Sequence, residues 1–203
     1  MESVIPLIDG ECVLVERFLN QTRADRFFLD IRQTALWHQP QLNLFGKVAR
    51  SPRLAAWYGD PGAVYTYSGL VNRPLPWFEG LRQLRRRIEG HTGARFNGVL
   101  INLYRDGNDA MGWHSDDEAE LVPGAVIASL SLGATRRFAM RHKRRPRLAV
   151  VNIALHHGSL LLMRGQTQQH WRHALPRTRQ TVGARINLTF RRVRIADAPG
   201  STG

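Results

Sequence analysis

From residue 96 onward the chain alternates short apolar segments with glycine and proline. These segments predict strands over 96–104, 125–132, 136–142, 147–155, 158–163 and 184–193. The first half is more helical: one helix is predicted over about 23–37, capped by Asn20 or Thr22, and a second over 74–90. Helices followed by many short strands are typical of a sheet sandwich or barrel buttressed by helices, an α+β fold.

Length and cysteine content narrow the class of protein. A chain of 203 residues fits one domain. No run of about 18 apolar residues predicts a membrane span, and residues 1–10, with Glu2 and Asp9, do not have the pattern of a secretory signal. The lone cysteine, Cys12, cannot form an internal disulfide, and without CxxC pairs a zinc ribbon is disfavoured. We therefore expect a cytoplasmic protein that does not enter membranes.

The net charge of +13 is unusually positive. It gathers in two clusters, Arg82, Arg85, Arg86 and Arg87 in one, and Arg136, Arg137, Arg141, Lys143, Arg144, Arg145 and Arg147 in the other. Clustered cations predict a polyanionic partner, most commonly nucleic acid. Arginine scattered for solubility is the alternative explanation.

A His-x-Asp pair, His114 and Asp116, offers two metal ligands at close spacing. In an extended segment residues i and i+2 project to the same side, so both can reach one point. With a distant histidine they would form the facial triad that holds non-haem iron(II). The pair alone is a weak signal, because His-x-Asp also occurs by chance in solvated loops. Candidates for the distant ligand are His156, His157, His170 and His173.

Polar and apolar residues alternate strictly over residues 185–191. Ile186, Leu188 and Phe190 would face a core, and the other face would carry Arg185, Asn187, Thr189 and Arg191. This donor-rich face without acids suits a dicarboxylate, because guanidinium groups bind carboxylates through paired hydrogen bonds. In the predicted strand 96–104, Asn102 and Tyr104 also share a face, and either bind the same anion or satisfy neighbouring loops.

Three aromatic residues in the first half are candidates for base contacts. Tyr65 and Tyr67 share a strand face and form either a stacking platform for a base or a cross-strand packing pair. Phe45, in Leu44-Phe45-Gly46-Lys47, is either an exposed hairpin tip or a core residue beside a turn.

Taken together, these segments resemble the AlkB family of iron(II)- and 2-oxoglutarate-dependent nucleic-acid dealkylases, in the branch of the animal DNA-repair homologues. The resemblance covers about residues 40–193 and follows the family order. Its motifs are Leu100-Ile-Asn-Leu-Tyr104, His114-x-Asp116-Asp117-Glu118, Pro123-Gly-x-x-Ile127-Ala-Ser-x-Ser131-x-Gly133, His170-Trp-x-His173 and Arg185-x-Asn187-Leu-Thr189-Phe190-Arg191.

The resemblance implies a double-stranded β-helix, or jelly-roll, core buttressed by N-terminal helices. We expect a single domain over 1–193, with 1–95 as helical support and nucleotide-recognition segment and 96–193 as the jelly roll. Residues 194–203 would form a flexible tail. A monomer is expected.

The resemblance also implies roles for individual residues. His173 would join His114 and Asp116 as the third iron ligand. Arg185 would bind the distal carboxylate of 2-oxoglutarate with Asn102 and Tyr104. Arg191, with Asn187 and Thr189 beside it, would serve the end that chelates iron.

On the substrate side, the resemblance assigns Asp117 and Glu118 to the damaged base, Tyr65 and Tyr67 to the wall of its pocket and Phe45 to a finger that fills the gap left by a flipped base. The implied reaction uses Fe(II), O2 and 2-oxoglutarate to demethylate N1-methyladenine or N3-methylcytosine in DNA, with release of formaldehyde. The alternatives are an RNA or protein N-demethylase or hydroxylase of the same chemistry, and a non-catalytic basic nucleic-acid-binding module.

Overall fold

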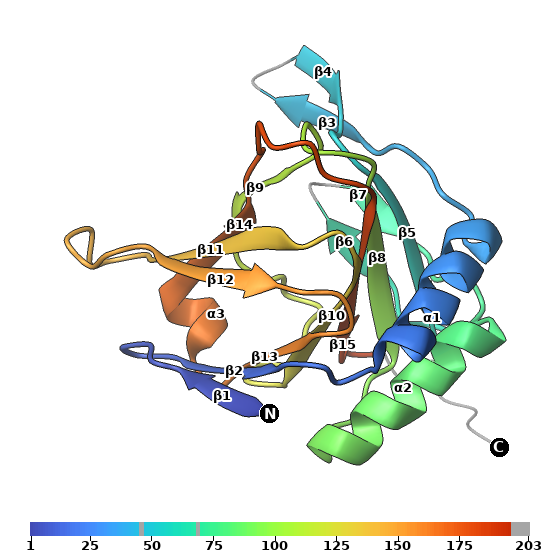
Figure 1. Cartoon of the computed structure of the whole chain (residues 1–203), viewed down its shortest axis with the longest axis horizontal. Helices are drawn as coiled ribbons and strands as arrows, with labels where there is room; N and C mark the ends of the chain where they lie inside the picture. Colours follow the sequence, from blue (N-terminus) through green and yellow to red (C-terminus); the bar gives the residue numbers. More distant parts are fainter. Residues whose placement is uncertain (45–46, 68–69, 196–203) are drawn as a thin grey trace, which may run out of the picture.

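Two antiparallel sheets lie face to face at the centre of the protein (Figure 1). The structure is a computed structural model that describes residues 1–44, 47–67 and 70–195. In spatial order the large sheet contains β1 (Glu2–Ile5), β2 (Glu11–Val15), β13 (Leu160–Arg164), β10 (Ile127–Gly133), β15 (Arg185–Arg191), β8 (Gly98–Tyr104) and β5 (Leu54–Gly59). The small sheet contains β12 (Val151–Leu155), β11 (Arg136–His142), β14 (Trp171–Leu175) and β9 (Met111–His114). The predicted α+β jelly-roll fold is confirmed.

Two helices, α1 (Gln21–Thr34) and α2 (Glu79–Thr92), cover the outer face of the large sheet (Figure 1). The predicted cap is confirmed for α1, because the Asn20 side chain accepts a hydrogen bond of 3.0 Å from the Arg23 N–H. Apolar side chains of both helices pack against Leu188 and Phe190 of β15 in one core cluster. The helices therefore bury the outer face of the strand whose inner face carries the polar row.

The predicted helix over 74–90 begins too early and ends too early. In the structure α2 starts at Glu79 and ends at Thr92, and the C-cap Gly93, with a φ of 68°, closes the helix in the left-handed region. The segment before it is extended: the Leu75 N–H donates to Trp57 O and its carbonyl accepts from the Gly59 N–H. A residue before proline avoids the helical region, and Leu75 precedes Pro76.

The space between the sheets is apolar on one side and polar on the other. Around β11 and β12 it is filled by one cluster of apolar side chains, including Leu14, Phe138 and Met140. Under β15 and β8 it is lined by the polar row of β15, in which Arg185 and Arg191 are almost fully buried. The predicted alternation of β15 is thereby confirmed, and the polar side marks where a ligand fits.

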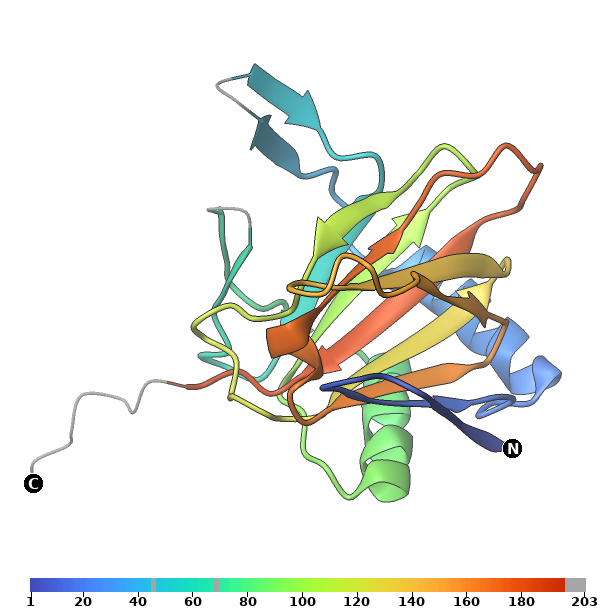
Figure 2. The same cartoon turned by 90° about the vertical axis from the view of Figure 1, so that its left-hand side faces the viewer.

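Two hairpins extend from the sandwich beside its open end (Figure 2). One pairs β3 (Gln41–Leu44) with β4 (Lys47–Arg50), and the other pairs β6 (Tyr65–Tyr67) with β7 (Leu70–Asn72). Phe45, the predicted finger, lies between β3 and β4 but outside the described residues.

The division of the chain at residue 95 stays a prediction, although β1, β2 and β5 from the first half belong to the large sheet. Of the predicted tail, residues 196–203 lie outside the described part of the chain. Among the described residues, no helix combines the length and apolar character required to cross a bilayer.

Candidate functional site

Three ligand side chains meet at the polar end of the sandwich. His114 ends β9, Asp116 follows it, and His173 lies opposite His114 on β14. The Nε2 atoms of His114 and His173 each lie 3.9 Å from an Asp116 carboxylate oxygen. One ligand atom from each residue lies within 4.8 Å of the others, so bonds of about 2 Å to a shared ion are within reach. The two imidazoles and the carboxylate match the ligand set of ferrous iron.

A β-bulge in β9 aims His114 inward. The pairing with β14 joins His173 to His114 and Leu175 to Met111, so three steps along β9 oppose two along β14. Simple alternation would place Met111 and His114 on opposite faces, yet both line the interior cavity. The bulge also places the Gly112 carbonyl 2.9 Å from His114 Nδ1. A proton on Nδ1 leaves the Nε2 lone pair facing Asp116, as a metal ligand requires.

Asp116 is held by two neighbours. Arg191 Nη2 donates to its carboxylate at 2.5 Å, and its backbone N–H donates to the Gln168 side-chain oxygen at 2.9 Å. Gln168 belongs to α3 (Thr167–His170), the short helix between β13 and β14. Both contacts fix the orientation of the ligand before any ion binds.

Burial and charge keep the three ligands deprotonated. Burial alone would raise the pKa of Asp116, but the Arg191 guanidinium and the two imidazoles bring it down to about 2. Burial lowers the pKa of His173 to about 3, and burial also lowers the pKa of His114. Metal ions bind the deprotonated forms, so the site is ready for a cation at neutral pH.

The polar row of β15 forms the other wall of the cavity. Arg185 is 1% exposed, and its Nη2 donates to Ser131 Oγ and Asn187 Oδ1, each at 2.9 Å. Its Nε is buried without a hydrogen-bond partner, and no carboxylate of the described chain pairs with it. Burial lowers the pKa of Arg185 to about 10. A buried cation without a counter-ion is costly, so this environment fits an anionic ligand.

Most other polar side chains that line this cavity have partners within the protein. Asn187 Nδ2 donates to Thr189 Oγ1 at 2.7 Å. Asn102 Oδ1 accepts from Arg53 Nε at 2.8 Å, and Tyr104 lies under the Arg185 guanidinium, 5.4 Å from ring centroid to Cζ. Arg53, 2% exposed, is not among the residues that the sequence predicts for the site, because the segment Ser51-Pro52-Arg53-Leu54 has no pattern that marks a buried arginine.

The residues predicted to contact a base differ in their surroundings. Tyr65 is fully buried and stacks on Trp57 with ring centroids 4.9 Å apart. Its hydroxyl donates to Glu118 Oε1 at 2.6 Å, and the other Glu118 oxygen is buried without a partner. Burial raises the pKa of Glu118. Tyr67 belongs to β6, but its side chain is outside the described structure.

Asp117, beside Glu118 in the chain, lies in a different environment. Its side chain is 56% exposed and forms an ion pair of 2.9 Å with Lys143. A further cavity of about 210 Å³ is lined by Asp116, Asp117, Glu118 and Arg191. It shares Asp116 and Arg191 with the cavity under β15, so of the three metal ligands Asp116 lies between the two cavities.

The predicted basic clusters are only partly free to bind an anion. On α2, Arg82 and Arg86 pair with Glu79 at 3.2 and 3.0 Å, and Arg85 pairs with Asp60 at 2.7 Å. In the second cluster Arg136 is 3% exposed, and it donates to backbone carbonyls between 106 and 176. For these residues intramolecular partners already satisfy part of the charge or of the hydrogen-bonding capacity, so they contribute less to binding an anion than the clusters in the sequence indicate.

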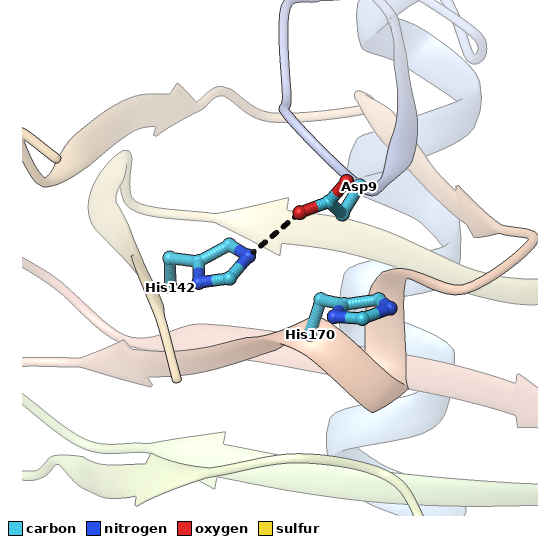
Figure 3. Close-up of side chains that lie close together, drawn as sticks. All are labelled: Asp9, His142 and His170. Carbon is cyan, nitrogen blue, oxygen red and sulfur yellow. Dashed lines mark ion pairs between the residues drawn. The ribbon is translucent and has the colours of Figure 1, made fainter. Parts of the chain in front are cut away.

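A second histidine cluster contains Asp9, His142 and His170 (Figure 3). His142 Nε2 lies 3.4 Å from Asp9 Oδ2. Its Nδ1 accepts from the Arg144 N–H at 3.1 Å, so in the neutral ring the proton is on Nε2 and points at Asp9. Arg145 also lies 3.3 Å from Asp9. This cluster fastens the loop before β2 to β11, and it accounts for His170 away from the triad.

The remaining candidates for the distant ligand also have other partners. His156 lies beside Thr135 at 3.1 Å, and His157 pairs with Asp25 at 3.0 Å. His173 is therefore the candidate that joins His114 and Asp116.

Comparisons with known proteins agree with this geometry. Residues 11–191 match the model of the 2OG-Fe(II) oxygenase superfamily. The chain is 44% identical over 182 residues to human "DNA oxidative demethylase ALKBH2", covering 85% of this chain and 70% of that protein. It is 42% identical over 199 residues to human "Alpha-ketoglutarate-dependent dioxygenase alkB homolog 3", covering 94% and 69%. The solved structure of OsALKBH1 has a TM-score of 0.66 at 16% identity, covering 94% of this chain and all of that one, and supports the fold alone.

Proposed function

The chain belongs to the AlkB family of 2OG-Fe(II) oxygenases, and on this basis we propose that it oxidatively demethylates N1-methyladenine and N3-methylcytosine in DNA, releasing formaldehyde. The supporting observation is the His114–Asp116–His173 set facing the arginine-bearing strand β15 across one cavity. Relatives named for DNA oxidative demethylation share 44% of their aligned residues with this chain.

Ferrous iron with 2-oxoglutarate would supply the activation of O2, with succinate and CO2 as coproducts. The residues of the protein would position the ion and the cosubstrate. His114, Asp116 and His173 would hold the ion. Arg185, whose charge has no partner in the described chain, would bind the distal carboxylate of the cosubstrate.

Further residues of β8 and β15 would complete the cosubstrate site. Asn102 and Tyr104 line the same cavity as Arg185, with Asn187 and Thr189 beside them. Arg191 gives one nitrogen to Asp116, and its Nε and Nη1 are buried without partners. We propose that these two nitrogens serve the end of the cosubstrate nearest the ion, while Nη2 orients the ligand.

Glu118 is the acid best placed to recognise a methylated base. It lines the cavity beside Asp116, one of its oxygens accepts from the Tyr65 hydroxyl, and the other is buried without a partner. N1-methyladenine and N3-methylcytosine are cations, so a carboxylate attracts them, and a lesion that blocks pairing lowers the cost of leaving the stack. Asp117, paired with Lys143, would act at the rim. Tyr67 as pocket wall and Phe45 as finger remain part of the proposal.

The test is formaldehyde release from methylated oligonucleotides, with Fe(II) or 2-oxoglutarate omitted as controls. We expect turnover only when both are present, and none in the double variant His114→Ala/Asp116→Ala. Full activity of that variant would disprove the proposal. Single-stranded DNA, duplex DNA, RNA and a methylated peptide tested side by side separate DNA repair from the RNA and protein alternatives.

A basic binding module without catalysis is the competing class of function. It predicts tight nucleic-acid binding with no retained metal, so metal content of the purified protein distinguishes the two. The intact triad favours the enzyme. We further propose a cytoplasmic monomer, which size measurement in solution and localisation in cells would check.

A further inference from the structure

Trp113 is displayed on the outside of the β9 bulge. The bulge turns Met111 and His114 into the interior and leaves Trp113 on the surface, 38% exposed. It is the residue directly before an iron ligand, and neighbouring Cα atoms lie about 3.8 Å apart. A large aromatic side chain is therefore exposed one residue away from a proposed iron ligand.

Unpaired positive charge surrounds this ring. The guanidinium carbon of Arg141 lies 4.4 Å from the Trp113 ring centroid. Arg141 of β11 is directly opposite Arg172 of β14, and both are exposed. Like charges in directly opposed positions destabilise a sheet. In the described chain neither arginine forms an ion pair with a carboxylate, in contrast to Arg82, Arg85 and Arg86 of α2, so this pair fits an anion from outside.

A groove of about 400 Å³ continues this surface along the loop between β11 and β12. Arg141, Lys143, Arg145 and Arg172 line it, and no Asp or Glu is among its lining residues. Lys143 and Arg145 already pair with Asp117 and Asp9. The charge left for a ligand is therefore concentrated beside Trp113.

We propose that Trp113 stacks on an unpaired base of single-stranded DNA that flanks the reacting nucleotide, while Arg141 and Arg172 bind its phosphates. This inference rests on the proposed function and names its substrate class. Stacking on an aromatic side chain tolerates any base, because every base has a π-face. In a duplex the flanking base is already stacked and paired, so the contact favours single strands.

The test compares Trp113→Ala with Trp113→Phe, which keeps a ring. Two probes are used without O2: a single-stranded oligonucleotide with one methylated base, and the same strand with abasic sites on both sides of it. We expect Trp113→Ala to weaken binding of the first probe about tenfold, and of the second much less. Trp113→Phe should keep most of the affinity. Leu29→Ala, exposed on α1, is the remote control.

Three results would overturn the inference. They are an equal loss for both probes, an equal loss for fully paired duplex, and a Trp113→Phe variant as weak as Trp113→Ala. Metal binding is measured in parallel, because loss of metal in Trp113→Ala would mean that the ring only supports β9. Binding needs no turnover, so an unmodified single strand still tests this contact if the demethylation proposal fails.

Discussion

Arg191 donates to the Asp116 carboxylate at 2.5 Å between the two sheets, with both side chains no more than 3% exposed. The ion pair joins the end of β15 to the loop after β9, so the strand proposed to bind the cosubstrate also positions a metal ligand. Arg191 lies on the large sheet, whereas Asp116 follows a strand of the small sheet, and the two residues are 75 positions apart in the chain.

Replacing Arg191 with methionine would leave a buried carboxylate without its cation. Loss of one partner of a buried pair costs about 3–5 kcal/mol. We expect the free energy of unfolding of metal-free Arg191→Met to fall by about that amount, as measured by urea denaturation. A divalent ion should stabilise this variant more than the parent protein, because it supplies the missing charge. A variant as stable as the parent would contradict the role of the pair.

Arg185→Met, unlike Arg191→Met, should weaken cosubstrate binding and not the stability of the ligand-free protein. Arg185 has no carboxylate partner in the described chain, so an apolar side chain of similar volume removes a buried charge at little cost. We expect unchanged or higher stability without ligand. Affinity for 2-oxoglutarate should fall about 100-fold, since truncating one partner of a buried charge pair costs about 2–5 kcal/mol. Anaerobic calorimetry measures the affinity, and unchanged binding would exclude Arg185 as the anchor.

Gln168 should influence metal binding without touching the ion. Its side-chain oxygen accepts the Asp116 N–H at 2.9 Å, and loss of an outer partner of a metal ligand typically lowers affinity about 10- to 100-fold. We expect this loss in Gln168→Met, measured by competition with a metal chelator. Gln168→Glu keeps an acceptor oxygen and is the matched control. Equal affinity in all three proteins would mean that the hydrogen bond does not position Asp116.

The metal-free protein should lose stability in mild acid. Burial lowers the pKa of His173 to about 3, against about 6.5 in an unfolded chain. Below pH 6.5 the unfolded chain therefore takes up a proton that the folded chain does not, and stability falls as pH falls. Between pH 6.5 and 5 the loss is about 2 kcal/mol. Urea denaturation across this range should show it, and His173→Asn should have a flatter profile.

Salt dependence of nucleic-acid binding should distinguish Arg172, beside Trp113, from the arginines of α2. Each phosphate contact to a single strand contributes about 0.7 to the slope of log affinity against log salt. We expect Arg172→Ala to reduce the slope by about that amount. Arg86→Ala should leave it unchanged, because Arg86 pairs with Glu79 at 3.0 Å. A flat response in the parent protein would mean that the free arginines do not bind phosphates.

The sequence is most informative for β15, because the two faces of this strand differ chemically. The alternation in 185–191 is visible because the apolar face of β15 packs under helices and its polar face lines a cavity. Leu75 was wrongly placed in a helix, because its pairing with β5, a distant partner, decides its extended conformation.

Other parts of the site have no local pattern. The bulge in β9 inserts one residue, so simple alternation misplaces Met111 relative to His114. Arg53 and Gln168 form hydrogen bonds with Asn102 and Asp116, respectively, which lie far from them in the chain. A short-range pattern does not reveal such contacts, because their partners are chosen by tertiary packing. On α2 the ion pair of Arg85 is of this kind, because Asp60 lies in a distant loop, whereas Glu79 and Arg82 are three residues apart in the same helix.

The reacting groups are shared between the layers: two imidazoles stand on the small sheet, and the cosubstrate row stands on the large one. Neither sheet alone carries both the imidazole ligands and the residues proposed to bind the cosubstrate. Any opening of the sandwich would separate the metal ligands from the residues proposed to bind the cosubstrate, so correct closure of the two sheets on each other is a condition for turnover.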